Sequence, residues 1–104
     1  MEKELTLETA KNIVNDSEKK FVWVGAEMHF DAAKKALDLA EDKIMCINPR
    51  ELVDMEEHAK KFNGNVFVCY HGNTSLAVVN YLGKLNIEAY SLKGGITSIV
   101  GEIF

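Results

Sequence analysis

Short apolar runs that alternate with helical segments constrain the fold of this chain more than any other feature of its sequence. The predicted strands are residues 21–24, 44–47, 66–69 and 87–90. The predicted helices are residues 7–15, 30–41, 49–62 and 75–85, with a short closing helix at 96–100. Because strands that alternate with helices of this length need crossover connections, we predict an α/β fold with a central, mostly parallel sheet of about 4–5 short strands.

Several helix boundaries carry recognisable capping residues. Thr6 is a plausible N-cap of the first helix. Asn48, Pro49 and Glu51 form a capping sequence for the third helix, and Asn63-Gly64 is expected to end it in a left-handed turn. In the fourth helix the spacing predicts that Leu76, Val79 and Leu82 face inward.

Length and composition narrow the class of protein. The chain has 104 residues, which fits one domain over 1–104, and 47% of them are apolar. The net charge is −4 and the Lys and Arg residues form no block, which argues against nucleic acid as a partner. No apolar run reaches the roughly 18 residues of a membrane-spanning helix. The acidic N-terminus lacks the apolar region of a signal peptide, so we expect a cytoplasmic protein with no membrane partner.

The cysteines and histidines indicate thiol chemistry rather than a metal site. Cys46 and Cys69 are expected to be free thiols, and Cys46 lies in an apolar run typical of the core. The histidines, His29, His58 and His71, show no metal-ligand spacing with them, so no metal is predicted. His29 and His58 lie in helical patterns and are expected at the surface. The aromatic residues fit the core, and no cofactor is predicted.

One segment, Cys69-Tyr-His-Gly-Asn-Thr-Ser75, carries a recognisable chemistry. A cysteine leaves a buried strand, and a short loop with one glycine runs into the start of a helix. Backbone N–H groups in such a loop form a nest for negative charge, and the helix dipole adds to it. Thr74 and Ser75 offer hydroxyls that can cap the helix. The segment therefore predicts Cys69 as a nucleophilic thiolate near neutral pH. The candidate substrate-binding residues are Tyr70, His71, Gly72, Asn73, Thr74 and Ser75.

The loop argues against phosphoryl transfer. Cysteine-dependent phosphatases place an arginine six positions after the cysteine, where its guanidinium holds the phosphoryl oxygens in a bidentate fork. Here that position is Ser75, and the loop contains no arginine. A sulfur atom carried on Cys69 suits this short loop better than a phosphate.

The segment resembles the active loop of the rhodanese family, in which Cys-x-x-Gly-x-(Arg/Thr)-Ser joins a strand to a helix. Cys69, Gly72, Thr74 and Ser75 stand at those places. The sequence Tyr90-Ser-Leu-Lys-Gly-Gly-Ile96 is similar to the family's Leu-x-Gly-Gly-Ile turn, which lies close to the active loop. Ile47-Asn-Pro-Arg-Glu-Leu52 resembles the family's Ile-Pro-x-x-Glu-Leu helix start. Together these three segments span residues 47–96, about half of the chain.

The resemblance implies a rhodanese-like, doubly wound fold and a sulfurtransferase. Cys69 would accept a sulfane sulfur from a small donor such as thiosulfate or a polysulfide and hold it as a persulfide. A thiol or cyanide would then remove the sulfur, with another protein as one candidate acceptor. Two half-reactions through one covalent intermediate predict ping-pong kinetics. Neither the physiological partner nor the oligomeric state follows from the resemblance.

Three departures from the family pattern bear on the substrate. The family has Asp-x-Arg after its first strand, whereas the matching stretch here is 24–26, Val-Gly-Ala. The Arg or Lys that often follows the cysteine is replaced by Tyr70 and His71, and the tryptophan after Gly-Gly-Ile is absent. A doubly charged donor is therefore expected to bind poorly. The same departures favour an alternative, a rhodanese-like binding or regulatory module without efficient turnover.

Overall fold

A computed structural model describes residues 3–47 and 59–101 and arranges its five strands in one sheet. The strands are β1 (Glu4–Leu5), β2 (Phe21–Trp23), β3 (Ile44–Cys46), β4 (Val66–Val68) and β5 (Tyr90–Leu92). Their order across the sheet is β1-β5-β4-β2-β3, and each neighbouring pair is parallel. The predicted α/β fold is confirmed, and its sheet is entirely parallel. All five carboxyl ends therefore point to one edge, which is where open parallel sheets place their ligands.

Strands β2, β3 and β4 lie within the predicted ranges, whereas β1 and β5 do not match the predictions. β1 was not predicted, because it is only two residues long and joins β5 through backbone bonds such as Lys93 N to Leu5 O at 2.9 Å. The predicted strand at 87–90 is displaced to Tyr90–Leu92. The Ile87 N–H instead donates to Leu82 O (3.0 Å) and closes the preceding helix, so pairing with β4 begins only at Tyr90.

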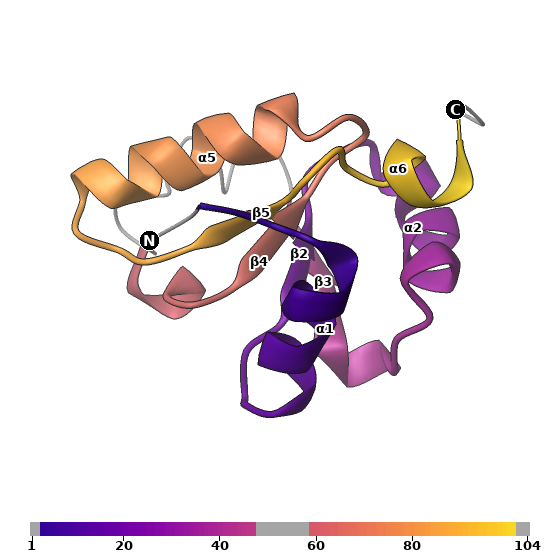
Figure 1. Cartoon of the computed structure of the whole chain (residues 1–104), viewed down its shortest axis with the longest axis horizontal. Coiled ribbons are helices and arrows are strands. Elements are labelled where there is room, and N and C mark those ends of the chain that lie inside the picture. Colours follow the sequence, from indigo (N-terminus) through magenta and orange to yellow (C-terminus); the bar gives the residue numbers. More distant parts are fainter. Residues whose placement is uncertain (1–2, 48–58, 102–104) are drawn as a thin grey trace.

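Helices cover both faces of this sheet, as Figure 1 shows. The α-helices are α1 (Leu7–Asn15), α2 (Phe30–Leu37), α5 (Asn73–Lys84) and α6 (Thr97–Val100). Short 3₁₀ helices lie at Glu27–His29, Glu41–Lys43 and Ala59–Phe62. In Figure 1, α5 lies on one side of the sheet and α1 and α2 on the other, with α6 beside the carboxyl ends of the strands.

The side-chain alternation of the strands divides the core into two clusters. One cluster joins α1, α2 and Ile96 to the strand residues that include Trp23 and Val68. The other joins α5 and the 3₁₀ helix Ala59–Phe62 to residues that include Phe67 and Cys69. Because consecutive strand residues point to opposite faces, β2, β3 and β4 each contribute to both clusters.

The helix predictions need correction at α2 and at α5. α2 ends at Leu37, because Asp38 takes a left-handed conformation (φ 52°), so Ala40 and Glu41 of the predicted range lie outside it. α5 begins at Asn73, two residues early, and the predicted inward stripe starts with Ser75 rather than Leu76. The predicted third helix and its capping sequence fall largely on 48–58, outside the described residues.

Other boundaries agree with their predictions. Thr6 caps α1, accepting a hydrogen bond from Thr9 N (3.3 Å) on its Oγ1, and α6 is the predicted closing helix. Gly64 has a positive φ (+81°), as expected at the left-handed turn after Phe62.

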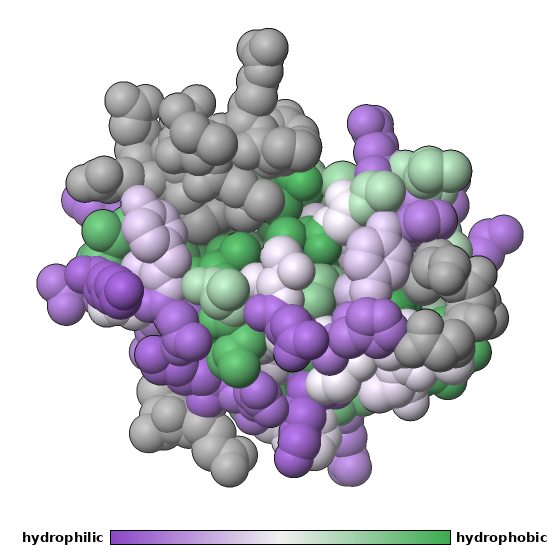
Figure 2. Space-filling model, turned by 90° about the horizontal axis from the view of Figure 1, so that it is seen from above, coloured by the Kyte–Doolittle hydropathy of each residue, from purple (hydrophilic) through white to green (hydrophobic). Residues whose placement is uncertain are grey.

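Within residues 3–47 and 59–101, no helix combines the length and the apolar character needed to cross a bilayer. Viewed from above, hydrophilic side chains occupy much of the periphery and leave limited hydrophobic patches between them (Figure 2).

Candidate active site

Cys69 is the first residue after β4, at the carboxyl edge of the sheet. It packs in the core cluster under α5 and keeps only 2% of its surface exposed. Its carbonyl oxygen accepts a hydrogen bond from Ile96 N at 2.8 Å, which ties the start of the loop to the segment after β5. The cysteine is therefore held in place by both its side chain and its backbone.

The sulfur of Cys69 lies among hydrogen-bond donors at the start of α5. Its Sγ accepts from Gly72 N at 3.1 Å and from Ser75 N at 3.3 Å. Ser75 Oγ also lies 3.3 Å from Sγ. N–H groups in the first turn of a helix have no partner within the helix, and the helix dipole makes this end partly positive. The arrangement can stabilise a thiolate on Cys69.

Glycines on two segments let the loop close this tightly. Gly72 has φ +94°, and a Cβ at this position would lie 3.1 Å from Gly94 N. Gly95 has φ +66°, and a Cβ there would lie only 2.5 Å from Tyr70 O and 2.6 Å from Cys69 O. Side chains are excluded where the two loops meet. The proximity of the Gly94-Gly95 turn to the cysteine loop, implied by the family resemblance, is confirmed.

The two loop hydroxyls do not cap α5 as predicted. The N-cap position is Gly72, which has no side chain to accept a hydrogen bond, and the helix has already begun at Asn73. Thr74 is exposed in the first turn. Ser75 points into the core instead, with its Oγ 3.3 Å from Gly72 O and 2.6 Å from Ser91 Oγ.

Tyr70 anchors the cysteine loop to the segment after β2. Its ring packs edge-on against Trp23, with centroids 5.0 Å apart. Its hydroxyl accepts from Ala26 N at 2.9 Å and lies 2.6 Å from His29 Nδ1. A Cβ on Gly25 would stand 3.1 Å from Tyr70 Cε2, so the glycine at this position leaves room for the aromatic ring.

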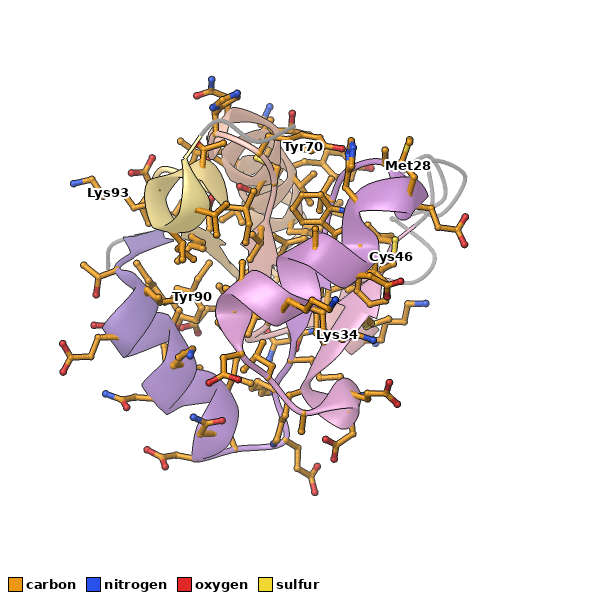
Figure 3. The ribbon with its side chains drawn as sticks, turned by 90° about the vertical axis from the view of Figure 1, so that its right-hand side faces the viewer. Met28, Lys34, Cys46, Tyr70, Tyr90 and Lys93 are labelled. Carbon is orange, nitrogen blue, oxygen red and sulfur yellow. The ribbon has the colours of Figure 1, made fainter. Side chains whose placement is uncertain are left out.

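The remaining candidate residues lie on the outside of the loop. His71 and Asn73 are exposed, and His71 Nδ1 lies 3.2 Å from Thr97 Oγ1 on the neighbouring α6. Lys93 is exposed before the Gly94-Gly95 turn, and Figure 3 shows it beside α6. The structure thus separates the sulfur-contacting residues, Gly72 and Ser75, from the exposed part of the loop.

Two residues near Cys69 were not predicted for the site. His29, expected at the surface, is half-buried and contacts the Tyr70 hydroxyl. Ser91 lies in β5 and contacts Ser75, yet the predicted strand ended one residue before it. The one signal in the sequence was a serine between the apolar residues Tyr90 and Leu92, which is unusual for a buried strand.

Cys46 lies at the same edge of the sheet but on its other face. Cys46 is the last residue of β3 and pairs with Trp23 of β2. Its side chain packs against the cluster of α1 and α2. Figure 3 shows it below Tyr70 and near Met28. Both cysteines are free thiols, as predicted, and the sheet separates their side chains. In the described part of the chain, no three His, Cys, Asp or Glu side chains are grouped to hold a metal ion.

Comparison with known proteins connects this geometry to a fold. No model of a protein family matches the sequence, and no curated protein matches it significantly. Several solved structures, in contrast, match the structure of this chain. A rhodanese-like domain protein from Staphylococcus aureus is 22% identical, with a TM-score of 0.63 over 99% of this chain and 94% of that one. A rhodanese-related protein from Thermoplasma volcanium is 17% identical, with a TM-score of 0.62 over 98% and 94% of the two chains.

A third structure places a similar domain inside a larger protein. Reduced CoADR-RHD from Bacillus anthracis is 13% identical, with a TM-score of 0.71 over 97% of this chain but 17% of its own. At these identities the likeness concerns the fold, which is that of rhodanese-like domain proteins over nearly the whole chain.

Proposed function

Because the chain has the fold of rhodanese-like domains, we propose that it is a sulfurtransferase that carries sulfane sulfur as a persulfide on Cys69. The observation that supports this most directly is the pair of hydrogen bonds from Gly72 N and Ser75 N to Sγ, at 3.1 and 3.3 Å. Backbone donors of this kind favour a sulfur anion, and a thiolate is the form of cysteine that attacks another sulfur.

In the first half-reaction the Cys69 thiolate attacks the outer sulfur of a donor such as thiosulfate or a polysulfide. A new S–S bond forms on Cys69 as the S–S bond of the donor breaks, and the electron pair of that bond leaves with sulfite or the shortened polysulfide. In the second half-reaction a thiolate or cyanide attacks the outer sulfur and takes it away. Cys69 then returns to the thiolate form, ready for another donor.

The loop amides support the anion at each stage. Before the first attack the negative charge lies on Sγ, where the amides of the loop stabilise it. After the attack the same amides stabilise the negative charge of the persulfide, and no charged side chain has to move. The stretch Val24-Gly25-Ala26, which contacts the loop through Tyr70, offers no charged side chain to the thiosulfate dianion, so we expect thiosulfate to bind weakly. We propose the chain as a thiosulfate sulfurtransferase (rhodanese)-like enzyme with a weaker preference for thiosulfate itself.

A second candidate, a rhodanese-like binding or regulatory module without efficient turnover, is favoured by a different observation. Cys69 keeps only 2% of its surface exposed, which restricts the approach of a donor to the sulfur. Under this alternative Cys69 would be a structural thiol and the exposed loop residues would contact a partner.

The mass of the intact protein after incubation with inorganic polysulfide or thiosulfate separates the two candidates. We expect one added sulfur atom in the wild type and in Cys46→Ser, removed by cyanide or dithiothreitol, and none in Cys69→Ser. Alkylation of a parallel sample with iodoacetamide establishes whether Cys69 is accessible. A wild-type protein that is alkylated at Cys69 but takes up no sulfur from either donor would support the binding module instead.

A further inference from the structure

Polar side chains buried in this core are few, and two of them meet beside the cysteine. Among the described residues, the buried polar or charged side chains are Asn65, Ser75 and Ser91. Asn65 has backbone partners, since its Oδ1 accepts from Lys20 N at 3.2 Å and its Nδ2 donates to Lys61 O at 3.5 Å. Ser75 and Ser91, at 0% and 1% exposure, contact each other, and Ser75 Oγ also lies 3.3 Å from the backbone oxygen of Gly72. A buried hydroxyl is costly without partners, so this pair needs an explanation.

Ser91 lies in the middle of β5, paired with Glu4 on one side and Phe67 on the other. Its Oγ is 2.6 Å from Ser75 Oγ, and Ser75 Oγ is 3.3 Å from Cys69 Sγ. The three atoms form a buried chain that runs from the sheet, through the first turn of α5, to the sulfur. Ser91 therefore touches the reacting atom only through Ser75.

A count of protons limits how this chain can be arranged. Ser75 Oγ has one proton and three neighbours within reach, namely Cys69 Sγ, Gly72 O and Ser91 Oγ. A thiol on Cys69 can donate to Ser75, whereas a thiolate only accepts, so Ser75 must then donate to it. Once the Ser75 proton points to the sulfur, the short contact between the two serines is a hydrogen bond only if Ser91 donates.

We propose that Ser91 is a positioning residue for Cys69. Its hydroxyl donates to Ser75 Oγ and thereby directs the Ser75 proton toward the sulfur, which adds a third hydrogen bond to the two from the backbone. When Cys69 ionises, its proton leaves to water and the two hydroxyls rotate, with no net proton transfer between them. Without the Ser91 hydroxyl, Gly72 O competes for the Ser75 proton and the thiolate is less stabilised.

The inference deepens the proposed function because it concerns the same sulfur, yet its test needs no sulfur donor. The rate of Cys69 alkylation by iodoacetamide is followed by peptide mass spectrometry across a pH series, since only the thiolate reacts. Ser91→Ala is expected to slow alkylation about fivefold at mildly acidic pH and to move the midpoint of the pH profile upward, the effect of one hydrogen bond. Ser91→Thr, which keeps the hydroxyl, is expected to restore the wild-type profile.

A double variant distinguishes positioning from general loosening of the core. If Ser91 acts through Ser75, then Ser75→Ala/Ser91→Ala has the same pH profile as Ser75→Ala alone. Effects that multiply in the double variant would overturn the proposal. So would a Ser91→Ala profile that matches the wild type. Thermal unfolding of each variant shows that the comparison is made on folded protein, and Ser→Ala removes only one buried oxygen.

The two proposals fail in different ways. If Cys69 takes up sulfur but its alkylation profile is the same in Ser91→Ala as in the wild type, the positioning role is wrong and the proposed sulfurtransferase activity stands. If Ser91→Ala shifts the alkylation profile while no donor gives an adduct, the positioning role stands and the sulfurtransferase is wrong.

Discussion

The two cysteines of this chain show how the same side chain acquires different surroundings at one edge of a sheet. Cys69 follows β4 and lies under α5, with its sulfur 3.1 Å from Gly72 N and 3.3 Å from Ser75 N. Cys46 ends β3 on the opposite face, and its Sγ lies 3.9 Å from the carbonyl oxygen of Ile47. One sulfur is therefore surrounded by amide donors and the other contacts a backbone acceptor.

The difference arises from the path that the backbone takes after each cysteine. After Cys69 the backbone turns at Gly72 and enters a helix of 12 residues, so the first free amides of α5 face back toward the sulfur. Cys46 still belongs to its strand, where the Ile47 N–H is taken by Trp23 O at 3.1 Å. Nucleophilic character is thus expected from the backbone around Cys69. Substitutions near each cysteine can test whether that backbone acts on Cys69 alone.

The largest effect is expected from Gly95→Ala. A Cβ at this position meets Tyr70 O at 2.5 Å and Cys69 O at 2.6 Å, so the turn must move away and the Ile96 N to Cys69 O bond is lost. We expect a destabilisation of about 4 kcal/mol, from steric overlap added to backbone strain. Sulfur uptake by Cys69 is expected to fall by more than about tenfold as the amides leave the sulfur.

Gly101→Ala is the matched control for backbone strain. Gly101 also has a positive φ (+78°), but a Cβ there meets no described atom within 4 Å. We expect a loss of about 1–2 kcal/mol from the unfavourable conformation alone, with sulfur uptake unchanged. Chemical denaturation measures both variants. Equal losses in the two would mean that the contact between the two loops contributes little.

A smaller effect is expected from Tyr70→Phe. Tyr70 contacts the surroundings of both cysteines. The backbone of Tyr70 belongs to the Cys69 loop, but its ring packs on the face that holds Cys46. Removing the hydroxyl deletes its contacts with Ala26 N and His29 Nδ1, so we expect a loss of about 1–2 kcal/mol in unfolding free energy.

Sulfur uptake distinguishes an anchoring Tyr70 from a reactive one. If the hydroxyl only anchors the loop, the uptake rate in Tyr70→Phe stays within about twofold of the wild type. A much larger loss would assign the phenol a direct contact with the donor. Tyr81→Phe on the exposed face of α5 is the control, and we expect it to change the stability by less than about 0.5 kcal/mol.

The smallest effect is expected at Tyr90, the first residue of β5. The Tyr90 hydroxyl donates a hydrogen bond to the Glu88 carboxylate, and this bond, together with burial and the carboxylate charge, raises the pKa of Tyr90 from 10.0 to about 12. The folded state therefore favours the neutral phenol. The resulting stability is present below pH 10.0 and is lost as the pH rises toward about 12.

Glu88→Gln and Tyr90→Phe are both expected to remove this alkaline component of the stability curve. The measurement is the free energy of unfolding by urea at several alkaline pH values, for each variant and for the wild type. Alkylation of Cys69 and Cys46 in these variants should match the wild type. A changed reactivity of either thiol would show that the two ends of the sheet are coupled.

Much of the site was predictable because its parts are close together in the sequence. The apolar run before Cys69, the glycine at 72 and the helix after it specify a strand, a turn and a helix N-terminus within a few residues. The glycine pair at 94 and 95 is distant from the loop in the sequence, and only the family resemblance predicted that the two lie close together. Local propensity and backbone geometry thus account for the amides around the sulfur.

The sequence by itself determined the alternation of strands and helices and the turn from β4 through Gly72 into α5, since each depends on residues that are neighbours in the chain. Only the tertiary structure decided that Ser91 contacts Ser75, that His29 contacts Tyr70 and that Cys46 faces away from Cys69. Those contacts depend on strand order, and the contact of Ser91 depends also on the displacement of β5 from a predicted start at 87 to Tyr90. A shift by an odd number of residues reverses which side chains face each side of the sheet.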